Sequence, residues 1–198
     1  MAAHAESYHG NLRRGFLVGG NSGGGTFAAI ATHLARDEDL SPCLTGSFLS
    51  CPILTDEMQG STDDIVHRFG AERNRSHETN KDAPLMDRAT QLSIREFAAF
   101  DWRSPYLTPF NFSTQSGLPP MYLQLCGLDP WRDTGKIYAE EIEAAGGKVR
   151  LSVYPGLPHC WWTTFPMLKV SEKYVTDLIE GVRWLLDASE GECTSSKL

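Results

Sequence analysis

A serine in a glycine-rich turn is the residue of this chain best suited to nucleophilic chemistry. Ser22 lies at the centre of residues 20–24 (Gly-Asn-Ser-Gly-Gly), between a short apolar run and an alanine-rich stretch. This Gly-x-Ser-x-Gly pattern predicts a nucleophile elbow, a tight turn from strand to helix that exposes the serine hydroxyl. Strand and helix nearly touch beside the strained serine, so we expect neither Gly20 nor Gly24 to accept a side chain. The backbone N–H of Gly23, at the start of the helix, is the predicted donor to an oxyanion.

A serine hydroxyl is a weak nucleophile unless a base removes its proton and an acid orients that base. Asp129 and His159 are the candidates for these two roles, because each comes directly after a predicted strand. The carboxyl ends of parallel strands share one edge of a sheet, and Ser22 emerges at the same edge. The sequence therefore predicts that Ser22, Asp129 and His159 meet there, in the chain order serine, acid, histidine.

Each of these roles has a competitor in the sequence. Asp133 stands four residues after Asp129 and is the alternative acid, although a helix N-cap is a simpler role for it. A single histidine is usually a surface or core residue, but the ordered set of three favours catalysis for His159. The other histidines follow no predicted strand: His4, His9, His33, His67 and His77.

Aromatic side chains flank the candidate acid and base. They are predicted to wall an apolar substrate pocket, with packing in the core as the alternative. The residues are Trp131, Trp161, Trp162 and Phe165. Cys160 lies beside the candidate base, but the sequence contains no basic partner for it, so we expect it to be passive.

Strand-like apolar runs alternate with helical patterns along the chain. This alternation is typical of an α/β fold with a mostly parallel sheet and helices on both faces. The predicted strands are Gly15–Gly19, Leu44–Ser50, Met121–Gly127 and Val149–Tyr154. Three helices are predicted. The first lies behind the elbow, and its inner face carries Phe27, Ile30, Ala31 and Leu34. The second runs from Asp133 or Thr134 to Ala145, and the third covers Val170–Leu186, with a wide apolar face that includes Val175 and Ile179.

Residues 55–118 interrupt the alternation with a long loop-and-helix excursion. Its aromatic residues favour a packed lid or pocket wall over disorder, with satellite core packing as the alternative. These residues are Phe97, Phe100, Trp102 and Tyr106. Residues 1–187 are predicted to form a single domain that includes this lid-like excursion.

Composition limits the classes of partner. The chain has 198 residues, 41% of them hydrophobic, and a net charge of −7 with scattered basic residues, which argues against nucleic-acid binding. The apolar runs are all shorter than a membrane-spanning helix needs, so a membrane partner is not expected. The substrate is expected to be a small molecule. The five cysteines form no Cys-x-x-Cys pair, and this spacing implies neither a disulfide framework nor a zinc site.

The last residues, 188–198, are expected to form a flexible polar tail. It ends in Ser196, Lys197 and Leu198, and this tripeptide at a free C-terminus is the peroxisomal import signal. The sequence therefore predicts a peroxisomal location and an import receptor as a partner.

Taken together, these motifs resemble the α/β-hydrolase-3 family, the hormone-sensitive-lipase-like esterases. The resemblance rests on residues 20–25, 104–109, 117–120, 127–133 and 154–159 in this order. It implies a serine hydrolase that cleaves a carboxylic ester or thioester through an acyl-enzyme, without metal or organic cofactor. With the peroxisomal terminus, the chain more narrowly resembles hydrolases of fungal host-selective toxin pathways that make epoxy-decatrienoic acid, a branch of secondary metabolism.

The chain departs from this family at two places. Asn21 stands where the family usually has an aspartate before the serine. In addition, only 21 residues precede Ser22, so this sequence does not include the family's upstream His-Gly-Gly-Gly oxyanion loop and N-terminal strands. His9-Gly10-Asn11 is no substitute for that loop. The expectations that follow are a shortened relative, a partial gene product or a weakly active enzyme. Phe16–Val18 is expected to lie on an edge that invites self-association. The alternatives are a non-catalytic hydrolase-fold protein and an amide hydrolase that uses the same residues.

Overall fold

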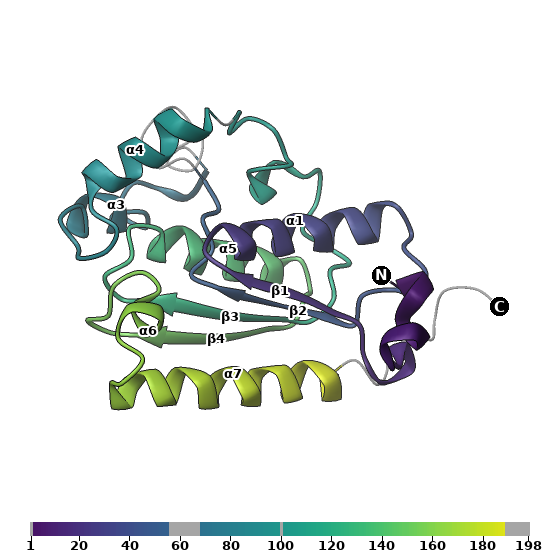
Figure 1. Cartoon of the computed structure of the whole chain (residues 1–198). Coiled ribbons are helices and arrows are strands. Elements are labelled where there is room, and N and C mark those ends of the chain that lie inside the picture. The colour runs from purple at the N-terminus through teal and green to yellow at the C-terminus, as the bar shows by residue number, and fades with distance from the viewer. Residues whose placement is uncertain (1, 56–67, 100, 189–198) are drawn as a thin grey trace.

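Four parallel strands form the sheet that positions the candidate site (Figure 1). They belong to a computed structural model that describes residues 2–55, 68–99 and 101–188. The strands are β1 (Leu17–Asn21), β2 (Gly46–Ser50), β3 (Met121–Cys126) and β4 (Val149–Tyr154), in the order β1-β2-β3-β4. All four predicted strands are present, and the predicted parallel α/β architecture is confirmed. β1 begins and ends two residues later than expected, so that it leads directly into Ser22.

Helices cover both faces of this sheet. Figure 1 shows α1 (Gly23–Asp37) and α5 (Arg132–Ala144) above it and α7 (Lys169–Ala188) below it. The one-turn helix α6 (Trp161–Thr164) follows β4, and two short 3-10 helices, Ala2–Tyr8 and Leu12–Arg14, precede β1. Within the described ranges, none of the helices has the length and apolar character that a membrane span requires.

The core is centred on β3, in which all six residues are buried. A strand enclosed on both faces by helices needs a near-continuous apolar run, which is why Met121–Cys126 is recognisable as a strand. Side chains from α1, β2 and α5 complete the main cluster around it, namely Ala28, Ala29, Leu49, Ile137, Tyr138 and Ile142.

Two helix faces differ from the prediction. The sequence predicts Phe27 on the inner face of α1, but this residue is 58% exposed, because the small residues Ala28 and Ala29 face the sheet instead. On α7, Val175 and Ile179 belong to the predicted apolar face, yet each is about half exposed. α7 packs tightly against the sheet at Gly181, where a Cβ atom would overlap the Tyr122 ring.

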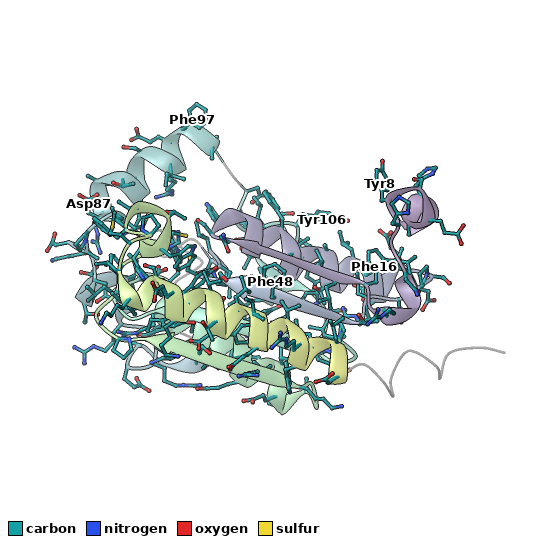
Figure 2. The ribbon with its side chains drawn as sticks, turned by 60° about the horizontal axis from the view of Figure 1, so that its bottom comes forward. Tyr8, Phe16, Phe48, Asp87, Phe97 and Tyr106 are labelled. Carbon is teal, nitrogen blue, oxygen red and sulfur yellow. The ribbon has the colours of Figure 1, made fainter. Side chains whose placement is uncertain are left out.

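The excursion after β2 contains α3 (Ser76–Thr79), α4 (Arg88–Ala98) and the 3-10 helix Pro109–Asn111. Figure 2 shows Phe97 projecting outward from α4, and this side chain is 94% exposed. Tyr106 is exposed as well. Phe100 and residues 56–67 lie outside the described residues. The described part therefore leaves two of the four aromatic residues unpacked, and the lid remains a prediction.

A buried histidine on α1 makes fold stability depend on pH. His33 is fully buried, stacks on Phe112 and shares a 2.9 Å hydrogen bond between Nε2 and the Tyr138 hydroxyl. Burial, assisted by the positive charge of Arg36, lowers the pKa of His33 to about 4. The unfolded chain keeps the ordinary pKa of about 6.5 and therefore binds more protons between these two values.

We expect the free energy of unfolding to decrease by up to about 3 kcal/mol as the pH falls from 6.5 to 4 because of His33. The stabilisation from this group is complete above pH 6.5 and is lost as its unfolded form takes up a proton. Urea unfolding of the wild type and of His33→Gln, which does not titrate, would measure this difference. Equal pH dependence in the two proteins would contradict the assignment.

Candidate active site

Ser22 occupies a strained turn between β1 and α1. Its φ of 54° and ψ of −125° are unusual for a residue with a side chain, as expected of a nucleophile elbow. The turn is held by a 2.8 Å hydrogen bond in which the Ser22 N–H donates to the Ser50 carbonyl oxygen at the end of β2. Gly23 is the first residue of α1, where helix N–H groups have no intrahelical acceptor and point outward.

The two glycines that flank this turn differ. A Cβ atom on Gly20 would lie 2.5 Å from the Gly24 carbonyl carbon, as expected from the close approach of strand and helix. A Cβ atom on Gly24 would meet nothing within 4 Å, so the expectation that Gly24 must lack a side chain is wrong. The reason is direction: the backbone of Gly24 forms the contact, but its own Cβ position faces open space.

These glycines offer a matched pair of variants. Gly20→Ala is expected to lower the free energy of unfolding by roughly 1–3 kcal/mol, because backbone atoms must move to admit the methyl group. Gly24→Ala lies inside α1 and is expected to be neutral or stabilising by up to about 1 kcal/mol, because alanine favours the helix. Urea denaturation of both variants measures these signs, and a Gly20→Ala protein as stable as the wild type would contradict the packing.

The three predicted side chains meet at the carboxyl edge of the sheet. His159 Nε2 lies 2.8 Å from Ser22 Oγ, and His159 Nδ1 lies 2.6 Å from Asp129 Oδ2. His159 and Asp129 are buried, with 5% and 1% exposure, whereas Ser22 is partly open to solvent. An ionised carboxylate only accepts hydrogen bonds, so Asp129 keeps the proton on Nδ1 and leaves the Nε2 lone pair facing the serine hydroxyl.

The loop that carries the acid is tied to the excursion. The second carboxylate oxygen of Asp129, Oδ1, accepts a 3.0 Å hydrogen bond from the Trp131 N–H. The side-chain amide of Asn80 donates to the Asp129 carbonyl oxygen at 2.9 Å and to that of Gly127 at 3.3 Å. Asn80 therefore positions the backbone of the acid loop. Sequence reasoning misses this role, since Asn80 stands in an ordinary polar stretch.

Asp133, the alternative acid, has a different role. Its Oδ2 accepts the backbone N–H groups of Arg75 and Ser76 at 3.0 and 2.8 Å, and its Oδ1 accepts Arg132 Nε at 2.8 Å. The expected N-cap role is also wrong, because α5 begins after Trp131 and Asp133 lies in its first turn. Asp133 instead accepts hydrogen bonds from the start of α3. The two segments are more than fifty residues apart in the sequence, so a local sequence pattern does not predict this contact.

The charge of the acid affects the histidine directly. Burial lowers the pKa of His159, but the adjacent Asp129 carboxylate outweighs this effect and raises the pKa well above 6.5.

A general base must be unprotonated to act. We therefore expect kcat/KM for an ester to fall as the pH decreases through a midpoint above 6.5. A pH-rate profile measures this midpoint, and full activity down to pH 5.5 would contradict the pairing of these groups.

The four aromatic residues predicted to line a substrate pocket fall into different environments. Trp131 is buried, with its ring edge-on to His159 at 5.8 Å between centroids and its Nε1–H donated to the Thr55 carbonyl oxygen. Trp161 is fully buried in a second cluster with Tyr154 and Tyr174, a placement that favours the core role. Trp162 stacks on Tyr174 at the margin of that cluster, and Phe165 is 40% exposed.

Cysteines lie beside the candidate triad. Cys51, Cys126 and Cys160 are free thiols, whereas Cys43 is disulfide-bonded, a bond that the cysteine spacing does not indicate. Two groups in the described part of the chain bring potential metal ligands within 4.8 Å of one another. They are Cys51 with His159 and Cys160, and Cys51 with Cys126 and Asp129.

These groups fit a metal ion poorly. A metal binds thiolates, yet burial raises the pKa of Cys51 to about 11. The hydrogen bond with Cys51, together with burial, also raises the pKa of Cys160. The His159 nitrogens are already bonded to Ser22 and Asp129. The prediction that the site uses no metal therefore remains our working interpretation.

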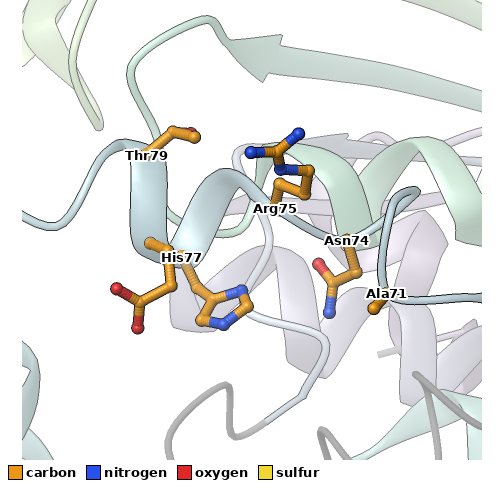
Figure 3. Close-up of a pocket in the computed structure, with 6 residues that line it drawn as sticks. Ala71, Asn74, Arg75, His77 and Thr79 are labelled. Carbon is orange, nitrogen blue, oxygen red and sulfur yellow. The ribbon is translucent and has the colours of Figure 1, made fainter.

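A separate hollow lies on the excursion (Figure 3). It has a volume of about 460 Å³ and is formed around α3. Its lining residues are Ala71, Asn74, Arg75, His77, Glu78 and Thr79. None of these is a predicted site residue, and we assign the hollow no role.

Comparison with known families decides which fold family these features represent. A family model described as the α/β hydrolase fold, α/β-hydrolase-3, matches residues 1–163. The chain belongs to the α/β-hydrolase-3 family. The elbow, the parallel sheet and the edge at which Ser22, Asp129 and His159 meet are thus features of an α/β-hydrolase.

Individual relatives agree with this family. The chain is 36% identical to an AB hydrolase superfamily protein of Schizosaccharomyces pombe, over 94% of this chain and 53% of that protein. It is 25% identical to the versiconal hemiacetal acetate esterase of Dothistroma septosporum, over 98% of this chain and 58% of the esterase. The crystal structure of vibralactone cyclase superimposes with a TM-score of 0.86 at 31% identity, covering 96% of this chain and 54% of the cyclase. This α/β-hydrolase chain therefore spans little more than half the length of these relatives.

Proposed function

We propose that this α/β-hydrolase is a serine esterase that cleaves a carboxylic ester or thioester through an acyl-enzyme. The observation that carries the proposal is the continuous hydrogen-bonded chain from Ser22 Oγ to His159 at 2.8 Å and on to Asp129 at 2.6 Å. A strained, partly exposed serine beside a buried histidine–carboxylate pair is the arrangement that activates a hydroxyl for attack on an acyl carbon.

In the proposed reaction, Ser22 Oγ attacks the acyl carbon while His159 Nε2 takes its proton. The Gly23 N–H donates to the oxygen that becomes negative, and His159 then returns the proton to the leaving alcohol or thiol. A water molecule, deprotonated by the same nitrogen, releases the acid and restores Ser22. Asp129 stabilises the imidazolium that exists between these steps without taking the proton itself.

The relatives support the choice of an ester as the substrate class. One of them carries the name of an acetate esterase. We propose a role in fungal secondary metabolism such as toxin biosynthesis on the sequence resemblance alone. The C-terminal Ser196, Lys197 and Leu198 lie outside the described residues, and on their sequence alone we propose a peroxisomal location and import receptor. β1 is an edge strand of the described sheet, which supports self-association through that edge.

A series of p-nitrophenyl esters from acetate to palmitate, an S-phenyl thioester and a p-nitroanilide would test the proposal. We expect turnover of the esters or the thioester and little turnover of the anilide, whose leaving group is poorer. Preference for the anilide would favour the amide-hydrolase alternative. A folded protein that turns over none of these compounds and binds them without chemistry would favour the non-catalytic alternative.

A further inference from the structure

Two thiols face each other directly beside the candidate base. Cys51 Sγ and Cys160 Sγ lie 3.1 Å apart, although the residues are 109 positions apart in the chain. Cys51 follows β2, and Cys160 follows His159 and precedes α6. Both sulfur atoms lie within 4.8 Å of a His159 nitrogen. A disulfide bond is about 2.05 Å long, so the sulfurs need to approach by only about 1 Å to be joined.

The backbone holds this pair in an unusual way. Cys51 has a φ of 39° and Cys160 a φ of 50°, in the left-handed region that residues with side chains rarely adopt. Strained positions of this kind persist only where the surrounding structure enforces them, and they gather at functional sites. Here the strain falls on both members of one cysteine pair and places the two sulfurs in contact.

We propose that Cys51 and Cys160 form a reversible disulfide on exposure to a hydroperoxide, and that this disulfide switches the active site off. Cys160 is the entry point, because it is partly exposed whereas Cys51 is 1% exposed. A disulfide is compatible with this buried site because it carries no charge, whereas burial destabilises a charged thiolate.

The chemistry balances with hydrogen peroxide as the oxidant. The sequence shows no basic partner for Cys160, but the structure brings its thiol into hydrogen-bond contact with His159, so the expectation of a passive thiol does not take this contact into account. In the proposed step His159 takes the Cys160 proton, and the Cys160 thiolate attacks one peroxide oxygen. The O–O bond breaks, Cys160 becomes a sulfenic acid, and the departing hydroxide takes the proton back from His159 as water. The Cys51 sulfur then attacks the Cys160 sulfur, the S–S bond forms, the S–O bond breaks, and a second water leaves with the Cys51 proton. Two thiols lose two electrons and one peroxide gains them.

The disulfide would act on catalysis through geometry. Cys160 is covalently joined to His159, so a shift of about 1 Å in Cys160 is transmitted to the imidazole that faces Ser22. A displacement of this size at a catalytic group costs about a hundredfold in rate. Formation of the disulfide is independent of the proposed esterase activity, and only its effect on turnover rests on that activity.

The test combines a peptide map with an activity ratio. The protein is treated with hydrogen peroxide, blocked with N-ethylmaleimide and digested with chymotrypsin, which cuts at Phe48 and so separates Cys43 from Cys51. We expect a Cys51–Cys160 linked peptide and a loss of ester hydrolysis of about a hundredfold that dithiothreitol reverses. Absence of the linked peptide overturns the proposal, whether or not the untreated protein hydrolyses esters.

Three variants sharpen the test, each compared before and after peroxide. Cys160→Gly suits the positive φ at this position, and Cys51→Ala provides a second route should the first variant fold poorly. Both are expected to keep their untreated activity after peroxide. Cys126→Ala retains the pair and serves as the matched control, with sensitivity equal to the wild type. Inactivation of Cys160→Gly and Cys51→Ala to the wild-type extent overturns the switch. If the linked peptide forms but the untreated protein hydrolyses no ester, the esterase proposal and the switch are both refuted. Cys51 and Cys160 then remain a site of reversible oxidation.

Discussion

Replacing Ser22 by alanine is expected to lower kcat for a p-nitrophenyl ester by a factor on the order of 10⁵ to 10⁶. The variant loses the only atom that forms the acyl-enzyme, while His159 and Asp129 keep each other in place at 2.6 Å. What remains is acceleration by substrate binding and by the oxyanion donor. Steady-state hydrolysis by purified protein, with the amount of active protein determined independently, measures the loss.

A matched control for this variant is Ser93→Ala. Ser93 is an exposed serine on α4, and its hydroxyl donates to the Ala89 carbonyl oxygen. Its replacement should leave kcat unchanged. Retention by Ser22→Ala of more than a few per cent of the wild-type rate would contradict the assignment of the nucleophile.

The second large effect is expected at the acid. Asp129→Asn should lower kcat/KM about ten-thousandfold, because an amide in place of the carboxylate favours the wrong tautomer of His159. It also removes the negative charge that raises the pKa of His159, so the acidic limb of the pH profile should move to lower pH. A pH-rate profile of the variant measures both changes.

Asp133→Asn is the control that separates the two candidate acids. Its carboxylate contacts the backbone of Arg75 and Ser76 and the side chain of Arg132, but not His159. We expect this variant to be less stable and to keep the wild-type pH midpoint. If Asp133→Asn instead lost activity ten-thousandfold while Asp129→Asn did not, the assignment of the acid would be reversed.

The parts of the fold that are predictable from the sequence are those with a local cause. Met121–Cys126 is recognisable because a strand buried on both faces must be apolar throughout. The elbow is recognisable because its backbone needs a glycine at position 20. Ser22, Asp129 and His159 can be paired because each comes directly after a strand, and parallel strands bring their C-terminal loops to one edge of the sheet.

The parts that could not be predicted depend on contacts between distant segments. Asn80 holds the acid loop and Asp133 supports α3, but the pairing of the excursion with this loop leaves no periodic signal. On α1 the prediction is confirmed for Ile30, which is buried, and is wrong for Phe27, which is exposed. Hydrophobicity alone places a phenylalanine on the inner face, whereas close packing against the sheet favours the smaller Ala28 and Ala29 there. Hydrophobic pattern alone does not contain that steric requirement.

The central claim is that Ser22 is a nucleophile activated by His159, and covalent labelling with a fluorophosphonate tests it most directly. The tryptic peptide of residues 15–36 contains Ser22 as its sole serine, so the adduct can be located by mass. We predict one adduct per chain, on Ser22, absent from Ser22→Ala and formed far more slowly in His159→Gln. A folded wild-type protein that stays unlabelled, or an adduct on another residue, would contradict the account.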